Sequence, residues 1–315
     1  MSLDPSASGR PLKVGIQLPE VEWPARWSDL LDIARTAEDV GFDSVWIGDH
    51  LLYRYASGES RGPWEAWTML AALAASTSRI QLGPLVASTA FHAPAMLAKM
   101  AATVDEISGG RLILGLGAGW NETEFAAYGF PFDRRIARFE EAFTIIRTLL
   151  RDGAIDFDGT FYQARDCELV PRGPRPGGPP LMIGSVGPRM LQIAMPHVDA
   201  WNVWFTDTGN SPRGIPPLRA LVDAACRTVG RDPAAVERSV AVQVRLPAGK
   251  GRFQGDFATG PAHPPLEGSA AEIAAELRAY AHEGIGHVQL VVDPITAPSI
   301  EALAPVLADL DRGRA

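Results

Sequence analysis

An ionisable pair, Asp49-His50, follows the apolar segment Trp46-Ile47-Gly48. An imidazole has an unperturbed pKa of about 6.5, so His50 could donate or accept a proton near neutral pH. Adjacent residues of an extended chain point in opposite directions, so only one of these two side chains would face a central site. A histidine whose hydrogen bonds serve only the structure is the alternative interpretation.

A second candidate segment, Gly115–Asn121, is rich in glycine. Trp120 stands where the dinucleotide motif GxGxxG needs its third glycine, so a dinucleotide site is not indicated. A backbone without side chains would still let a flat ligand approach closely, next to the Asn121 carboxamide. Packing of the glycines under a core tryptophan is the alternative. Glu122 and Glu124 are typical of a helix N-terminus, and we assign them no chemistry.

Two more segments are unusual for strands. Ile183–Pro188 combines Ser185 with two glycines, which suits a phosphate monoester, although no P-loop lysine follows to bind a nucleoside triphosphate. In Leu82–Ser88 a glycine and a proline interrupt an apolar run, which indicates a local irregularity of the backbone. His92 follows this run, and we interpret it as a surface residue rather than a ligand.

These segments follow apolar runs that alternate with amphipathic ones, a pattern typical of βα units. The predicted strands are Val14–Leu18, Ser44–Ile47, Ile80–Val86, Leu112–Gly115, Leu181–Gly184, Ala200–Val203, Val240–Leu246 and Val288–Val292. The predicted helices are Trp27–Val40, Glu65–Ser76, Ala95–Ile107, Arg135–Arg151, Arg189–Met195, Leu218–Val229, Ala271–His282 and Ile300–Leu310. Eight of each predict an α/β protein, a single (β/α)8 TIM barrel whose functional residues lie at the carboxyl ends of its strands.

Three stretches exceed a minimal barrel: a hairpin insertion at Ile155–Pro180 and polar loops at Thr206–Pro217 and Pro247–Gly268. We expect both loops to cover the substrate, with simple surface decoration as the alternative. Residues 1–11 lack the apolar core of a secretory signal, so we expect a short disordered lead before one domain at residues 12–315.

The composition of the chain argues against several classes of function. The 315 residues are 46% hydrophobic and 21% charged, as in a globular chain with a large core. The net charge of −8 argues against a nucleic-acid partner, and no apolar run is long enough to span a membrane. Cys167 and Cys226 lack the spacing of a metal site or a disulfide framework, so we expect no metal and a cytoplasmic location.

Taken together, these segments resemble the luciferase-like monooxygenase superfamily, and within it the branch that uses the deazaflavin coenzyme F420. The resemblance runs along nearly the whole chain. It depends on the order and spacing of Gly41–His50, Ser108–Leu112 with Gly117–Trp120, Ile183–Pro188 and Glu283–His287.

The resemblance implies roles for individual residues. His50 matches the catalytic histidine of the family, and Asp49 and Asn121 match positions that bind the coenzyme. Leu85-Val86, followed by Ala87, matches the place where family members carry a non-prolyl cis peptide behind the coenzyme ring. Gly184, Ser185, Val186 and Gly187 match the turn that holds the coenzyme phosphate.

The expected function is therefore an F420-dependent oxidoreductase that transfers a hydride between the deazaflavin and a small organic substrate. An FMN-dependent monooxygenase is one alternative, and a barrel that binds coenzyme without turnover is another. A homodimer is left open, and the substrate is not identified.

Overall fold

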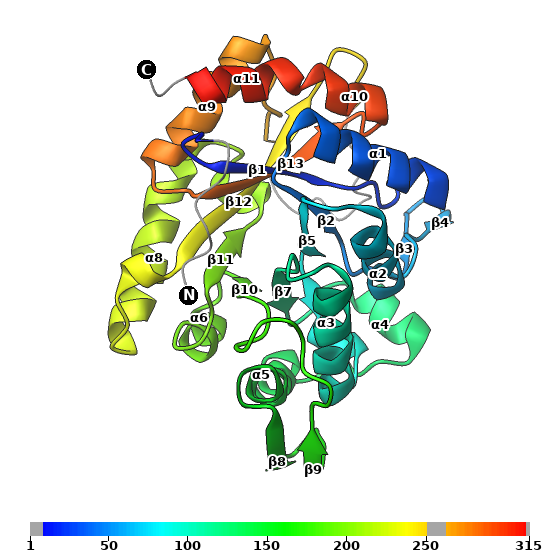
Figure 1. Ribbon diagram of the computed structural model, residues 1–315, viewed down its shortest axis with the longest axis vertical. Coiled ribbons are helices and arrows are strands. Elements are labelled where there is room, and N and C mark those ends of the chain that lie inside the picture. Colours follow the sequence, from blue (N-terminus) through cyan, green and yellow to red (C-terminus); the bar gives the residue numbers. More distant parts are fainter. Residues whose placement is uncertain (1–8, 251–262, 313–315) are drawn as a thin grey trace.

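A parallel sheet wound into a barrel forms the centre of the computed structural model, which describes residues 9–250 and 263–312 (Figure 1). The strands follow one another around it in the order β5-β2-β1-β13-β12-β11-β10-β7-β6. Their bounds are β1 (Lys13–Gln17), β2 (Ser44–Ile47), β5 (Gln81–Pro84), β6 (Ala87–Ser88), β7 (Leu114–Gly117), β10 (Leu181–Gly184), β11 (Ala200–Val203), β12 (Glu237–Arg245) and β13 (His287–Asp293). The predicted α/β barrel is confirmed.

Strands β5 and β6 occupy one strand position, interrupted at Leu85-Val86. Leu82 in β5 bridges Leu112, just ahead of β7, and Ala87 in β6 pairs with Leu116 in β7. These contacts bring the two ends of the sheet together, so the nine segments fill eight strand positions, as the alternation in the sequence predicts.

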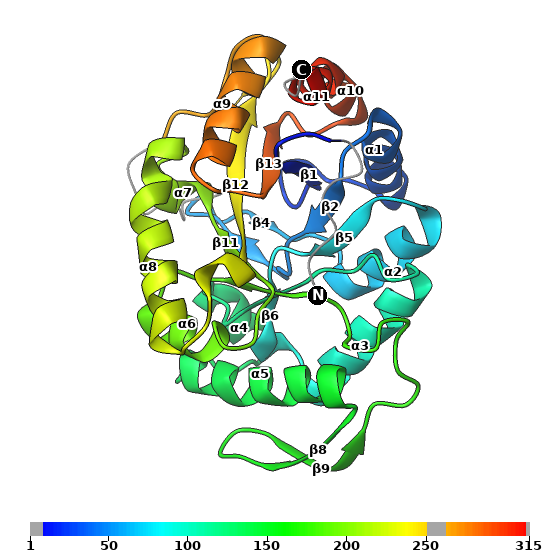
Figure 2. The same cartoon turned by 60° about the vertical axis from the view of Figure 1, so that its left-hand side comes forward.

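The helices form a ring around these strands, which Figure 2 shows most directly. Their bounds are α1 (Trp27–Val40), α2 (Ala66–Ser76), α3 (Pro94–Ile107), α4 (Glu122–Tyr128), α5 (Arg135–Asp152), α6 (Pro188–Ala194), α7 (Phe205–Thr208), α8 (Ile215–Thr228), α9 (Ala270–His282), α10 (Ala297–Ala302) and α11 (Ala304–Arg312). The predicted helix Ile300–Leu310 is in fact α10 and α11, which are separated by Leu303.

Helix α1 shows how local sequence sets these elements. Leu30, Ile33 and Ala37 recur at helical spacing, and all three are buried on the face toward the barrel. Asp29 accepts a hydrogen bond from the backbone of Arg26 at the start of the helix. Gly41 ends it with a φ of 101°, a conformation that costs glycine less than any other residue.

The predicted polar loop Thr206–Pro217 is wrong in part, because most of it is helical. It contains the end of α7, a 3-10 turn at Pro212–Gly214 and the first turn of α8 from Ile215. The prolines of this stretch stand in first helical turns, where a missing N–H costs no hydrogen bond. Of the predicted loop Pro247–Gly268, residues 251–262 lie outside the described residues.

The predicted insertion after α5 is a hairpin of β8 (Ala154–Asp158) and β9 (Gln163–Glu168). It projects from the ring of helices beside α5 (Figures 1 and 2). A second, shorter hairpin of β3 (Tyr53–Arg54) and β4 (Ser60–Arg61) follows β2.

Of the predicted disordered lead, residues 1–8 lie outside the described residues, whereas Arg10 is buried. Its guanidinium forms ion pairs with Asp43 at 3.2 Å and with Asp311 in α11 at 2.9 Å. Arg10 thus ties the segment just ahead of residue 12 to α11.

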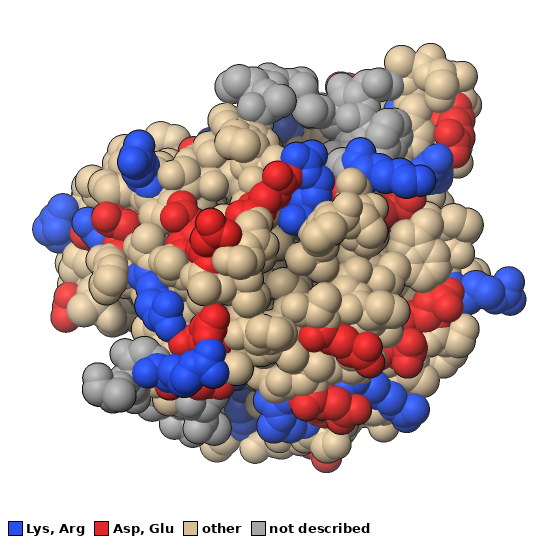
Figure 3. Space-filling view, turned by 90° about the horizontal axis from the view of Figure 1, so that it is seen from above, with Lys and Arg blue, Asp and Glu red and all other residues tan. Residues whose placement is uncertain are grey.

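The surface carries both signs of charge. On the face in Figure 3, basic and acidic side chains are interspersed, without a continuous basic patch. None of the helices in the described part of the chain is long and apolar enough to cross a membrane. Cys167 and Cys226 are free thiols.

Candidate active site at the barrel mouth

The sequence-predicted site residues all follow the carboxyl ends of parallel strands. Asp49 and His50 come after β2, Leu85-Val86 forms the break between β5 and β6 with Ala87 at the start of β6, and Asn121 follows β7. The turn Gly184–Gly187 follows β10. Because these strands are parallel neighbours in one barrel, the residues gather at one face of it, which we call the barrel mouth.

Asp49 is buried and bound on its own side of the mouth. Its Oδ2 accepts a hydrogen bond from the Ser88 N–H at 2.9 Å and lies 3.1 Å from the His92 Nε2. His92, interpreted from the sequence as a surface residue, is instead the partner of this carboxylate. Asp49 therefore links the carboxyl end of β2 to β6 through its carboxylate.

His50 points to a different set of partners. Its Nδ1 lies 2.9 Å from the Glu124 Oε1, and its ring packs against Tyr53 and Trp120, with ring centres 4.9 and 5.6 Å away. Asp49 and His50 thus diverge, as expected for neighbours in an extended segment. Burial lowers the pKa of His50, but the hydrogen bond to Glu124 and the charges of Glu20, Glu124 and Asp49 raise it to a net value above the usual range.

Two carboxylates that we did not predict complete this cluster. Glu124, in the first turn of α4, has a fully buried side chain that also accepts from the Leu51 N–H at 2.8 Å. Glu20, after β1, accepts from the Tyr53 hydroxyl at 3.0 Å and from the Gln17 side chain at 2.5 Å.

The chain makes room for Glu20 at Gly48. A Cβ at Gly48 would lie 2.0 Å from the Glu20 Oε1, so a side chain there would displace this carboxylate. Burial and the charges of Glu20 and Glu124 hold the pKa of Tyr53 well above its usual range, which keeps its hydroxyl protonated. A glycine before Asp49-His50 was the one signal for Glu20 in the sequence, and Glu124 had none.

The floor of the mouth is built around Val86. The peptide between Leu85 and Val86 is cis, as predicted. Glycines on the neighbouring strands surround the Val86 methyl groups: a Cβ would lie 2.8 Å from them at Gly115 and Gly117, and 3.0 Å at Gly184. The glycines that suggested a close approach of a ligand therefore also accommodate the Val86 side chain.

Beside this floor lies a buried hydroxyl that lacks a hydrogen-bond partner among the described residues, the Ser88 Oγ. A buried polar group left unpaired costs about 1–3 kcal/mol. Gly119, with a φ of 74°, approaches so closely that a Cβ there would lie 2.6 Å from this oxygen. A polar group at the ring edge of a flat heteroaromatic coenzyme would give this hydroxyl its missing partner.

The turn Gly184–Gly187 is half-buried at the rim of the mouth. The Ser185 Oγ accepts from the Gly187 N–H at 3.1 Å, which leaves its hydroxyl proton for a ligand. The Ser185 carbonyl accepts from the Trp201 indole at 2.7 Å and so holds the turn in place. A Cβ at Gly187 would meet no atom closer than 3.5 Å.

The remaining predicted residues have structural partners. The Asn121 side chain is buried and donates to the Leu52 carbonyl at 3.0 Å, which fixes the segment after His50. Ala87 is buried in β6, where it pairs with Leu116 of β7. The described residues contain no group of three or more histidines, cysteines or carboxylates placed to hold a metal ion.

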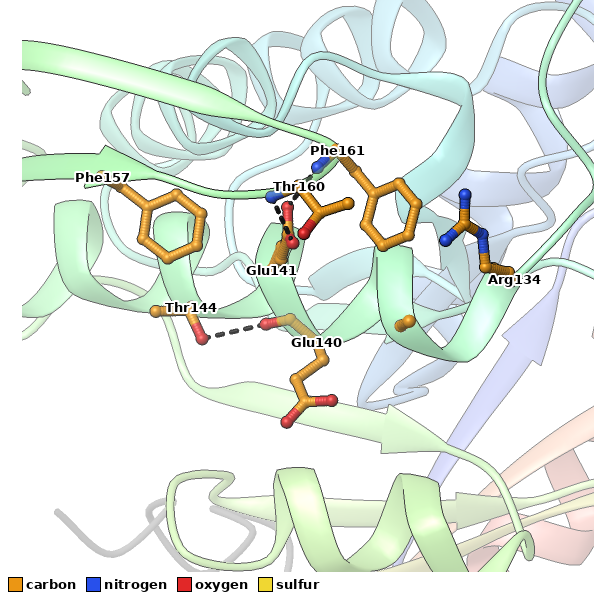
Figure 4. Close-up of a pocket in the computed structure, with 8 residues that line it drawn as sticks. Arg134, Glu140, Glu141, Thr144, Phe157, Thr160 and Phe161 are labelled. Carbon is orange, nitrogen blue, oxygen red and sulfur yellow. Dashed lines mark hydrogen bonds between the residues drawn. The ribbon is translucent and has the colours of Figure 1, made fainter.

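A pocket of about 460 Å³ lies away from the mouth, between α5 and the hairpin of β8 and β9 (Figure 4). Glu141 reaches from α5 into the hairpin turn and accepts from the N–H groups of Thr160 and Phe161 at 2.8 Å each. Its carboxylate is therefore occupied by the turn, and the residues here do not form a catalytic arrangement. The lining residues are Arg134, Ala137, Glu140, Glu141, Thr144, Phe157, Thr160 and Phe161.

Comparison with known proteins gives one family model, described as luciferase-like monooxygenase, that matches residues 9–248. Over 221 residues the chain is 32% identical to a 5,10-methylenetetrahydromethanopterin reductase of Archaeoglobus fulgidus, covering 70% of this chain and 60% of that protein. It is 36% identical over 189 residues to an F420-dependent glucose-6-phosphate dehydrogenase of Amycolatopsis mediterranei, covering 58% and 54%. The chain therefore matches less than two thirds of the length of these relatives.

Among solved structures, an F420-dependent secondary alcohol dehydrogenase bound to an F420-acetone adduct superposes with a TM-score of 0.80. The match covers 95% of this chain and 99% of that one, at 21% identity. At this identity the likeness establishes the shared barrel fold.

Proposed function

Because the chain belongs to the luciferase-like monooxygenase family, we propose that it is an oxidoreductase that uses coenzyme F420 to transfer a hydride to or from a small organic substrate. The observation that carries this proposal is His50, a histidine at the barrel mouth whose pKa is raised by the carboxylates around it. Hydride transfer to a carbonyl, or from an alcohol, also moves a proton, and His50 supplies or accepts it. The F420-dependent relatives support the choice of coenzyme.

When bound, the deazaflavin would supply the hydride carrier, and the protein would supply position, exclusion of water and the proton. We assign coenzyme binding to Asp49, to Leu85, Val86 and Ala87 at the floor, and to Asn121. The rim turn Gly184, Ser185, Val186 and Gly187 would hold the phosphate, with the Ser185 hydroxyl as a donor. The unpaired Ser88 hydroxyl supports a polar ligand edge at this place.

We assign the proton transfer to the His50 Nε2. The Nδ1 is bound to Glu124, so Nε2 is the ring nitrogen left to exchange a proton with a substrate. The exposed indole of Trp120 packs against the same ring and would form part of the wall along which the substrate lies.

An FMN-dependent monooxygenase is the second candidate, favoured by the family description. The two predict opposite responses to oxygen, because a deazaflavin reacts poorly with O2. Parallel titration of the purified protein with F420 and FMN, followed by absorbance and fluorescence, distinguishes them. We expect saturable binding of F420 and turnover that does not depend on O2. Binding of FMN alone, with turnover that requires O2, would replace the first candidate with the second.

A coenzyme-binding barrel without turnover is the third candidate. Tight F420 binding without reduction or oxidation of the bound coenzyme, across alcohols, aldehydes and ketones, would favour it. We further propose that residues 12–315 act as one cytoplasmic domain with a small-molecule substrate and neither nucleic-acid nor membrane partners. Whether the chain forms a homodimer is a separate question, which sedimentation at several protein concentrations answers.

A further inference from the structure

Glu124 lies at the centre of the contacts that hold His50. Its side chain is 1% exposed, and both of its oxygens are occupied by the segment that follows β2. One oxygen, Oε1, lies 2.9 Å from the His50 Nδ1. The other, Oε2, accepts from the N–H groups of Leu51 at 2.8 Å and Leu52 at 3.4 Å. One carboxylate thus fixes both the imidazole and the backbone beside it.

The backbone contacts by themselves do not require a charge. A glutamine at position 124 could accept from Leu51 and Leu52 through its amide oxygen. Its NH2 group would then face the His50 Nδ1 and donate to it, which would move the ring proton to Nε2. The carboxylate does the opposite, because it can only accept, so the neutral imidazole keeps its proton on Nδ1.

Other groups around His50 reinforce the positive form of the ring. Glu20 approaches from the end of β1, Asp49 lies on the same segment as His50, and the Tyr53 hydroxyl from β3 donates to Glu20. The contacts recorded for the ring place carboxylates, a phenol and the Trp120 indole around it. An opposite charge within hydrogen-bond distance is the strongest of these attractions, and among the described residues Glu124 is the carboxylate at that distance.

We propose that Glu124 is a positioning residue, which keeps the His50 proton on Nδ1, presents Nε2 to the substrate and stabilises the imidazolium from which a proton is delivered. This inference rests on the proposed function for its catalytic meaning. The state of the His50 ring is nevertheless measurable in the protein without coenzyme, so the two can fail separately.

The test compares Glu124→Gln with a matched control, Glu122→Gln. Glu122 is in the same first turn of α4 but is exposed, so its loss removes one negative charge from the helix without touching His50. The sequence has six histidines, and comparison with His50→Ala assigns the His50 signals in an NMR titration of imidazole-labelled protein. We expect the pKa of His50 to fall by about one unit or more in Glu124→Gln. It should stay unchanged in Glu122→Gln.

The ring ¹⁵N shifts provide a second measurement, whose wild-type part can be made without a substitution at position 124. Above its pKa, the wild-type His50 should carry its proton on Nδ1, and in Glu124→Gln on Nε2. With coenzyme and substrate, the pH at which turnover changes should move down by the same amount as the pKa. An unchanged His50 pKa in Glu124→Gln, or a proton on Nε2 in the wild type, would overturn the proposal. If Glu124→Gln does not fold, the wild-type tautomer alone decides.

These outcomes separate this inference from the proposed function. A wild-type protein that binds neither F420 nor FMN, but shows the Nδ1 proton and the shift on Glu124→Gln, would refute the function and keep the role of Glu124. A protein that turns over with F420, but has the same His50 pKa in the wild type and in Glu124→Gln, would keep the function and refute the role of Glu124.

Discussion

At the scale of single residues, neighbours in the chain have different partners at the barrel mouth. Asp49 and His50 are adjacent, yet Asp49 binds Ser88 and His92 while His50 binds Glu124. A change at one position should therefore affect coenzyme binding and proton transfer differently.

His50→Ala tests the proton-transfer role. General acid–base catalysis contributes about 10²–10⁴-fold, so turnover should fall by that factor. Coenzyme affinity should change little, because the residues assigned to coenzyme binding keep their own contacts. Steady-state kinetics and coenzyme titration of the variant provide the two numbers. Lost coenzyme binding with intact chemistry in the residual complex would instead make His50 a binding residue.

Ser88→Ala tests whether the buried hydroxyl forms a hydrogen bond with the coenzyme. The Ser88 Oγ has no partner in the described protein, so its removal costs no internal hydrogen bond, and the melting temperature of the coenzyme-free protein should stay the same or rise slightly. Coenzyme affinity should fall. Calorimetry and coenzyme titration measure the two effects, and a loss of stability with unchanged affinity would contradict this role.

At the scale of elements, the glycines near the barrel mouth have two different structural roles. Gly115, Gly117 and Gly184 leave space that the Val86 side chain fills. Gly187, by contrast, stands at the start of α6, where a Cβ would make only ordinary van der Waals contacts, the nearest at 3.5 Å. The two kinds of glycine should therefore respond differently to an added side chain.

Gly187→Val and Gly117→Ala form a matched pair. At Gly117 a Cβ would lie 2.8 Å from a Val86 methyl, and overpacking of this kind typically costs about 1–3 kcal/mol, so the melting temperature should fall. At Gly187 the backbone is extended, with a φ of −69°, and the nearest atom is 3.5 Å from a new Cβ, so stability should hold while coenzyme binding weakens. Thermal melts and coenzyme titrations report both. Unchanged affinity in Gly187→Val would mean that the turn does not bind the phosphate.

At the scale of the whole molecule, the barrel encloses polar groups as well as apolar ones. The His287 Nε2 lies 2.7 Å from the Ser44 hydroxyl, which also accepts from the Trp46 indole at 2.7 Å. Gln289 and Ser239 both accept from the Asn202 amide, so β11 and β12 are linked inside the barrel to β13, the strand that carries His287. These bonds join different strands of the barrel, and His287 is buried among them.

His287 makes the stability of the barrel depend on pH. Burial, aided by the positive charge of Lys13, lowers the pKa of His287 to about 3, against about 6.5 in an unfolded chain. Between these values the unfolded state binds more protons than the folded one. The contribution of the neutral His287 ring to stability is therefore fully present above about pH 6.5 and is lost as the pH falls toward 3. The melting temperature should therefore drop between pH 6.5 and 4.

Substitution of His287 separates its contribution to the pH dependence of stability from that of other titrating groups. His287→Gln should flatten the dependence of the melting temperature on pH over that interval, whatever its effect on stability at pH 7. The control His282→Gln, at an exposed position of α9, should keep the wild-type slope. Equal slopes in the wild type and His287→Gln would show that His287 does not titrate on unfolding in this range.

The sequence by itself determined the barrel and the place of its site. Apolar periodicity, glycine stops such as Gly41 and the alternation of strand and helix are local signals, and they predicted eight βα units within a few residues. The parallel order then places Asp49, His50, Asn121 and Gly184–Gly187 at one face, because every strand of such a barrel ends on the same side.

Only the tertiary structure decided which side chains meet there. His50 and Glu124 are 74 residues apart, and Asp49 and His92 are 43 apart. A local pattern at Glu124 indicates a helix N-terminus and nothing about its partner, and His92 looks like any loop histidine. Their pairing depends on how the barrel closes and on how far each loop reaches over the strand ends. These are set by long-range packing, which the periodicity of a single segment does not encode.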